Sequence, residues 1–131
     1  MDKPVSNLKL QKLLYFVQGV TLIMTGKPAF DDSLEAWKYG PVVPSVYYNF
    51  SSYGSDPILM EYMSDVDLDS IRDHIDYVID TFKDTSAISL VNETHRKGSP
   101  WYYAYNQGDG FISNDKIKDY FSTEYLRRDD A

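Results

Sequence analysis

The chain has 131 residues, a formal net charge of −7 and a hydrophobic fraction of 43%. This length and composition suit one globular domain with a single core and exclude a disordered chain. The absence of cysteine excludes disulfide frameworks, thiolate nucleophiles and cysteine-based zinc sites.

The distribution of charge and the N-terminal residues bear on the protein's location and on the kind of partner it could bind. Residues 54–131 carry eight Lys and Arg but sixteen Asp and Glu. This charge disfavours direct nucleic-acid binding, because phosphate backbones need a positively charged protein surface. The acidic excess could steer a basic protein partner, or it could serve solubility alone. We expect no signal peptide, no membrane span and a cytoplasmic location, since residues 1–5 lack a cationic leader and the apolar stretch 13–24 is short.

The first predicted element is a helix from an N-cap at Ser6 to about Thr25, ended by Gly26. Its apolar residues recur at helical spacing, and further apolar residues leave little polar face. A helix that is apolar over most of its circumference is usually packed on several sides. We therefore expect a central core helix, with these inward positions: Leu10, Leu13, Leu14, Val17, Val20 and Met24.

The next segments are shorter. Residues 33–38 alternate roughly with period two, which predicts a short strand or extended segment within 30–39. Pro44 suits the first turn of a second helix that closes at Gly54, and residues 55–66 are predicted to form a loop.

The second half is predicted to contain three further helices. Residues 68–82 form an amphipathic helix by spacing, and a shorter helix covers 85–94. We expect residues 101–110 to be an aromatic-rich loop or irregular turn, and Ser113 to cap a last helix through Phe121. The fold class is thus mainly α: a compact bundle of about five helices in a single domain, 1–131, with a frayed tail from about 127.

No catalytic, cofactor or metal site is predicted. The glycines at 19 and 26 do not have phosphate-loop spacing, and Pro28 stands where a Ser or Thr would hold magnesium. The Asp65, Asp67 and Asp69 series resembles a calcium loop, but Ser70 occupies the place of the required glycine. His95 could be a general base only if a pocket with another polar group converged on it. A structural histidine at a helix end is the favoured interpretation.

Tyrosine is unusually abundant, with twelve in the chain beside two tryptophans. These side chains dominate binding hot spots, although in a small domain many aromatic residues simply form the core. Two clusters in or beside predicted loops are candidate partner-binding residues: Tyr47, Tyr48 and Tyr53, and then Tyr102, Tyr103 and Tyr105.

Four blocks of the sequence together resemble a known family: 6–15, 35–47 (with its Gly-Pro-Val-Val-Pro run), 93–101 and 113–121. They are similar to the Panacea domain, which includes SocA-like antitoxins and phage-associated proteins and was formerly a domain of unknown function. Residues that match the family pattern, and that either maintain the fold or bind, are Gln11, Tyr15, Trp37, Gly40, Pro41, His95, Pro100 and Trp101.

The resemblance implies a function. Such a protein is a non-enzymatic, mainly helical antitoxin that binds and neutralises a cognate toxin encoded by the adjacent gene. SocA-like members can instead act as adaptors that deliver a partner to an AAA+ protease. The alternative is therefore a phage- or prophage-encoded adaptor that binds a host protein.

Overall fold

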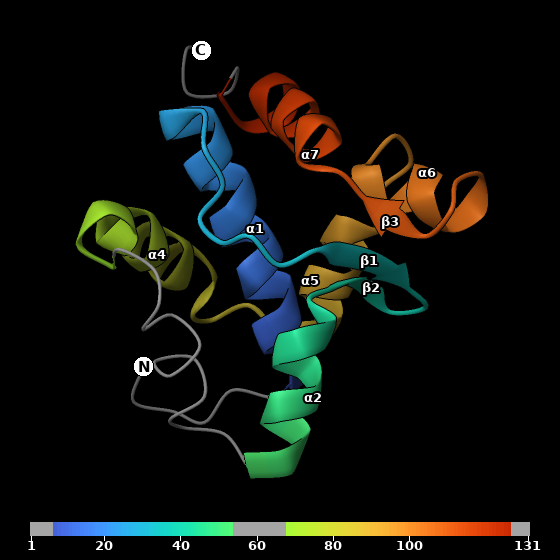
Figure 1. The fold of residues 1–131 in the computed structure, drawn as a ribbon, viewed down its shortest axis with the longest axis horizontal. Coiled ribbons are helices and arrows are strands. Elements are labelled where there is room, and N and C mark those ends of the chain that lie inside the picture. Colours follow the sequence, from blue (N-terminus) through green and yellow to red (C-terminus); the bar gives the residue numbers. More distant parts are fainter. Residues whose placement is uncertain (1–6, 54–67, 127–131) are drawn as a thin grey trace.

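The computed structural model describes residues 7–53 and 68–126, which form a helical domain with one small sheet (Figure 1). In chain order the elements are α1 (Asn7–Thr25), β1 (Leu34–Trp37), β2 (Gly40–Val42), α2 (Pro44–Tyr53), α4 (Leu68–Phe82), α5 (Ala87–Thr94), α6 (Pro100–Asn106), β3 (Phe111–Ile112) and α7 (Asn114–Phe121). A π-helical segment, Ser122–Leu126, follows α7.

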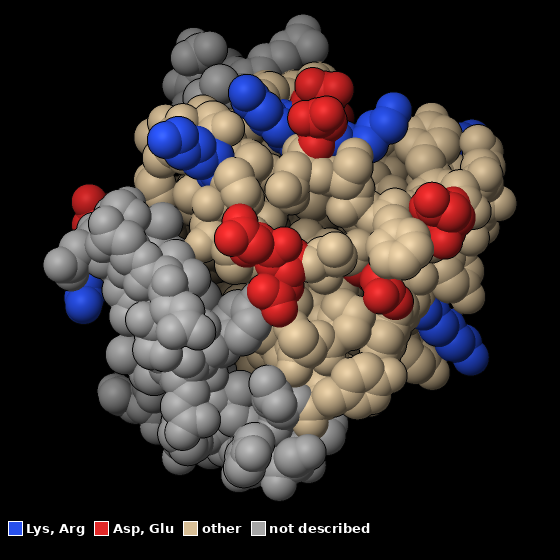
Figure 2. Space-filling view, viewed as in Figure 1, with Lys and Arg blue, Asp and Glu red and all other residues tan. Residues whose placement is uncertain are grey.

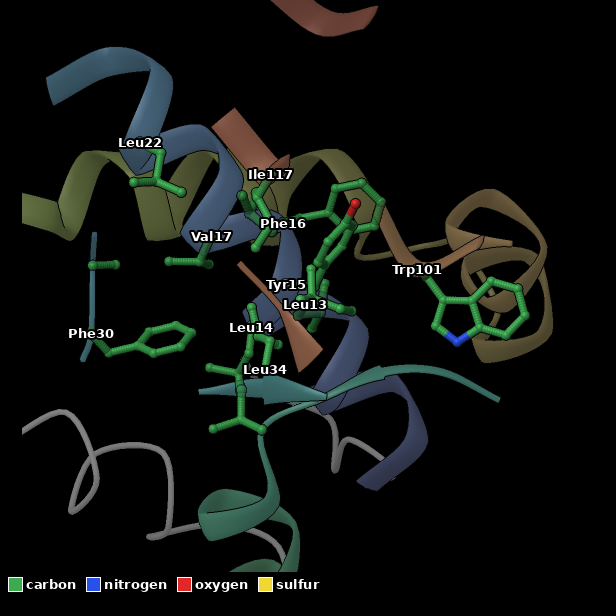
Figure 3. Close-up of a cluster of buried hydrophobic side chains, with 14 of the residues drawn as sticks. Leu13, Leu14, Tyr15, Phe16, Val17, Leu22, Phe30, Leu34, Trp101 and Ile117 are labelled. Carbon is green, nitrogen blue, oxygen red and sulfur yellow. The ribbon is translucent and has the colours of Figure 1, made fainter. Parts of the chain in front are cut away.

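Helix α1 is the centre of the domain, as predicted. It contacts α2, α4, α5, α7 and β2, and its neighbours surround it in Figure 1. Its ring pair, Tyr15 and Phe16, packs edge-on against Phe121 of α7 at centroid distances of 5.3 and 5.9 Å. Figure 3 shows these rings beside Leu13 and Ile117. Because neighbours cover α1 on most sides, its polar residues Gln11, Lys12 and Gln18 are buried as well.

The sheet has the strand order β2-β1-β3, and both pairings are antiparallel. The expected extended segment at 30–39 is therefore β1, whose inward residues Leu34 and Ala36 are buried. Its other side chains, Glu35 and Trp37, are half-buried on the opposite face. The sheet thus presents one face to the core and keeps one partly open.

Serine N-caps explain the starts of α5, α6 and α7. Ser113 accepts a hydrogen bond from the backbone N–H of Lys116 and caps α7, as predicted. Ser86 caps α5 in the same way, through the N–H of Ser89. Gly26 adopts a φ of +79°, and its N–H bonds the carbonyl of Leu22, so it ends α1.

Two expectations from the sequence were wrong. The expected loop at 101–110 begins with helix α6, because Ser99 caps its N-terminus and Pro100 fits its first turn. Met24, expected to point inward, is 62% exposed near the end of α1. The predicted N-cap Ser6, the stop at Gly54, the loop at 55–66 and the tail from 127 lie outside the described residues.

None of the helices in the described ranges is both long enough and apolar enough to cross a bilayer.

Candidate partner-binding surface

The β1–β2 hairpin is held from the core side through the backbone of alternate residues. The indole Nε1 of Trp101 donates to the carbonyl oxygen of Trp37 at 2.7 Å. The imidazole of His95 hydrogen-bonds the backbone of Tyr39. The ammonium of Lys12 donates to the carbonyl oxygen of Pro41 at 3.1 Å. These donors come from α6, the end of α5 and α1, so three helices together fix the position of the hairpin.

Lys12 is the least expected member of this arrangement. Its side chain is 0% exposed, and no carboxylate pairs with it among the residues that the structure describes. Burial lowers the pKa of Lys12 from its ordinary 10.5 to about 8. The lysine therefore carries a positive charge at neutral pH in a place where that charge is costly.

Gly40 allows Lys12 to reach the hairpin. A Cβ at this position would lie 2.5 Å from Cε of Lys12 and 2.9 Å from Oγ1 of Thr94. The φ of Gly40 is +119°, in a region that residues other than glycine rarely adopt. Glycine at position 40 is thus required by a close approach of the backbone to a buried side chain.

His95 is the C-cap residue of α5, and its ring lies flat against Trp101 with centroids 3.7 Å apart and an interplanar angle of 3°. Burial and the charge of Lys12 lower the pKa of His95, while the hydrogen bond with the Tyr39 backbone raises it. Its Nε2 is buried and has no hydrogen-bond partner within the described part of the chain. The arrangement favours a neutral imidazole that supports Trp101 and the hairpin.

Two groups of rings lie at the hairpin, and we call them together the aromatic surface. Trp37 contacts Tyr47 at 5.1 Å and Tyr48 at 6.1 Å between centroids. Trp101, which holds the carbonyl of Trp37, stacks on Tyr105 at 4.8 Å. The surface therefore joins α2, β1 and α6, and its members are Trp37, Tyr47, Tyr48, Trp101 and Tyr105.

The structure brings some of the candidate tyrosines together and separates others. Tyr48 is 60% and Tyr105 is 47% exposed, and both belong to the aromatic surface. Tyr102 is partly buried and packs against the core, while Tyr103 is 52% exposed. Tyr53 is the last residue of α2.

The family-motif residues fall into two groups. Tyr15 packs in the core, and Pro100 starts α6. The others lie in or around the hairpin, and five of them make contacts described above: Trp37, Gly40, Pro41, His95 and Trp101. The sixth, Gln11, accepts a 2.8 Å hydrogen bond from the backbone N–H of Val43.

Lys12 was missed at the sequence level, although a signal was present. Its neighbours Leu10, Leu13 and Leu14 lie on a helix that is apolar on nearly every side. A polar residue set among apolar neighbours on such a helix has little solvent-facing side available, so we expect it to be buried and to need a partner. Gln18 follows the same logic, since its amide bonds the backbone of Ala29 and Phe30.

A surface cavity of about 580 Å³ lies between α6, β3 and α7. Its lining is mixed, with Tyr103, Phe111 and Ile112 beside Lys116 and Glu124. His95 does not line this cavity. In the described ranges no group of three or more His, Asp or Glu side chains could hold a metal ion.

The fold is a mainly helical domain in which exposed aromatic side chains lie beside a small hairpin. The family model of the Antitoxin SocA-like, Panacea domain matches residues 10–102, and the chain belongs to this family. A curated relative, Antitoxin SocA from Caulobacter vibrioides (strain NA1000 / CB15N), is 38% identical over 113 residues. That alignment covers 77% of this chain and 60% of the relative. No solved structure matches the chain.

Proposed function

We propose that this protein is an antitoxin that neutralises a toxin protein by direct binding through the aromatic surface. Membership of the SocA-like family supports an antitoxin role, and the relative is named an antitoxin. The observation that carries the mode of action is that two ring pairs, Trp37 with Tyr48 and Trp101 with Tyr105, are both anchored at one fixed hairpin. Rigid aromatic rings bury much area at a small entropic cost, so they suit this role.

Two substitutions test the surface. Tyr48→Ala and Tyr105→Ala remove half-exposed rings from it, and each should weaken binding of the toxin about tenfold or more if the ring is a hot spot. Tyr77→Ala is the matched control, because Tyr77 is 57% exposed but lies on α4. All three variants should keep the thermal stability of the parent within a few degrees.

The experiment is co-expression with the product of the adjacent gene, followed by measurement of growth and of binding. Rescue by the parent and by Tyr77→Ala, with loss of rescue in Tyr48→Ala, supports the proposal. A neighbour that is harmless alone, or that remains lethal beside the folded parent, contradicts it. Recovery of an AAA+ protease or another host protein in place of the neighbour would assign the adaptor role instead.

A further inference from the structure

The open face of the sheet carries a carboxylate surrounded by rings. Glu35 is opposite Phe111 on β3 and opposite Val42 on β2, and paired residues of antiparallel strands share a face. Trp37 follows on the same side of β1. Phe111 is 58% exposed, and Val42 is buried but outside the main core cluster. A single acidic group thus lies among apolar side chains.

Glu35 has a fixed orientation and spare binding capacity. Its Oε1 accepts a 3.0 Å hydrogen bond from Nε1 of Trp37. Among the described residues, no lysine or arginine forms a salt bridge with Glu35. The nearby Lys38 lies instead over the ring of Tyr39, with Nζ 5.5 Å from the ring centroid. A half-buried carboxylate without a cation can accept further charged hydrogen bonds at little cost in rotamer entropy.

The surrounding rings favour the same kind of ligand. Trp37, Tyr48 and Phe111 come from three elements, and ring faces attract cations through their quadrupoles. A planar guanidinium can stack on such rings while it pairs with a carboxylate in two-point geometry, which an ammonium cannot do.

The charge of the molecule agrees with this ligand. In Figure 2 the face in view carries both acidic and basic side chains, and the acidic ones near its centre are surrounded by uncharged surface. The chain as a whole carries a net charge of −7. The net negative charge would favour the approach of a basic segment, and the local geometry at Glu35 would select its cationic side chain.

We propose that Glu35, framed by Trp37, Tyr48 and Phe111, binds an arginine side chain of the protein partner. The inference rests on the proposed function, because it names the chemistry that the toxin must present to the aromatic surface. The cavity of about 580 Å³ begins at Phe111, so residues next to that arginine have a concave surface to occupy. Glu35 is thus the charged centre of an otherwise apolar contact.

The test uses the whole protein and a small probe. N-acetyl-arginine amide is titrated into the labelled protein, and the two indole N–H signals of its two tryptophans are followed by NMR. The Trp37 indole, bonded to Glu35, should shift in a saturable way, and the Trp101 indole behind the hairpin should shift less. N-acetyl-citrulline amide, which has the same shape without the charge, and Glu35→Gln should each weaken binding about fivefold or more. Asp76→Asn, on the exposed face of α4, is the control for loss of one negative charge.

Each outcome decides the proposal. A saturable shift that requires both the guanidinium and the Glu35 carboxylate supports it. Equal shifts with citrulline, equal shifts in Glu35→Gln, or stronger binding of N-acetyl-lysine amide than of the arginine probe overturn it. If toxin is neutralised while the arginine probe fails to bind, this inference falls and the proposed function stands. If the probe binds but the neighbouring gene product is not neutralised, the proposed function falls and the arginine site remains.

Discussion

Replacing Lys12 by methionine tests the most unusual feature of the domain, a buried lysine that no described acid neutralises. Methionine keeps most of the length and apolar volume of the side chain but removes the charge and the hydrogen bond to the Pro41 carbonyl. The change should therefore separate the cost of burying the ammonium from the benefit of the contact that it makes.

The expected magnitude follows from the pKa. Lowering the pKa of Lys12 from 10.5 to about 8 corresponds to about 3 kcal/mol of unfavourable free energy for the charged form in the folded state. Below pH 8 the lysine is protonated in both states, so this full cost is present. Between pH 8 and 10.5 the folded protein loses the proton before the unfolded chain does. Unfolding then takes up a proton, and stability due to this group rises with pH.

The variant should behave differently. At pH 7, Lys12→Met removes the cost of about 3 kcal/mol but leaves the Pro41 carbonyl without its donor, which costs about 1–3 kcal/mol. We therefore expect a free energy of unfolding equal to that of the parent or up to about 2 kcal/mol higher. By pH 10 the order should reverse, because the difference between parent and variant changes by about 2–3 kcal/mol over this range.

The assay is urea unfolding followed by circular dichroism at a series of pH values for parent and variant. Lys9→Met is the matched control, since Nζ of Lys9 donates to the Lys83 carbonyl at the same 3.1 Å but on the exposed side of α1. A constant difference between parent and Lys12→Met from pH 7 to 10 would refute the reasoning. So would an NMR titration that places the Lys12 ammonium above pH 10.

Further predictions concern the other contacts of the hairpin. Gly40→Ala should lower the free energy of unfolding, measured by chemical denaturation, by about 2 kcal/mol or more. The new Cβ would clash with Lys12 and Thr94, and the φ of +119° disfavours alanine. The pKa of His95 is lower in the folded protein than in the unfolded chain. As the pH falls below 6.5, the unfolded chain therefore takes up a proton first, and the free energy of unfolding should decrease. His95→Gln should show a weaker acid dependence in the same assay, and an identical profile would contradict this assignment.

Local patterns in the sequence were sufficient to predict much of the fold. The apolar positions of α1, the amphipathic spacing of 68–82 and the cap at Ser113 each depend on residues within a turn or two of one another. The same short-range logic could have found α6, because Ser99 and Pro100 form an ordinary helix start that the nearby aromatic run obscured. The family blocks likewise point to the SocA-like class from the sequence alone.

The sequence alone thus determined a mainly helical fold with α1 at its centre, its family and its approximate helix boundaries. Tertiary structure decided which residues work together. Lys12 meets Pro41 across 29 positions, Trp101 meets Trp37 across 64, and Phe111 comes to lie beside Glu35 through strand pairing. Periodicity describes which way a side chain points within its own element, but it carries no information about which distant backbone group that side chain will meet. These long-range contacts arise because three helices and a third strand pack against one hairpin. They create the aromatic surface and place Glu35 beside it.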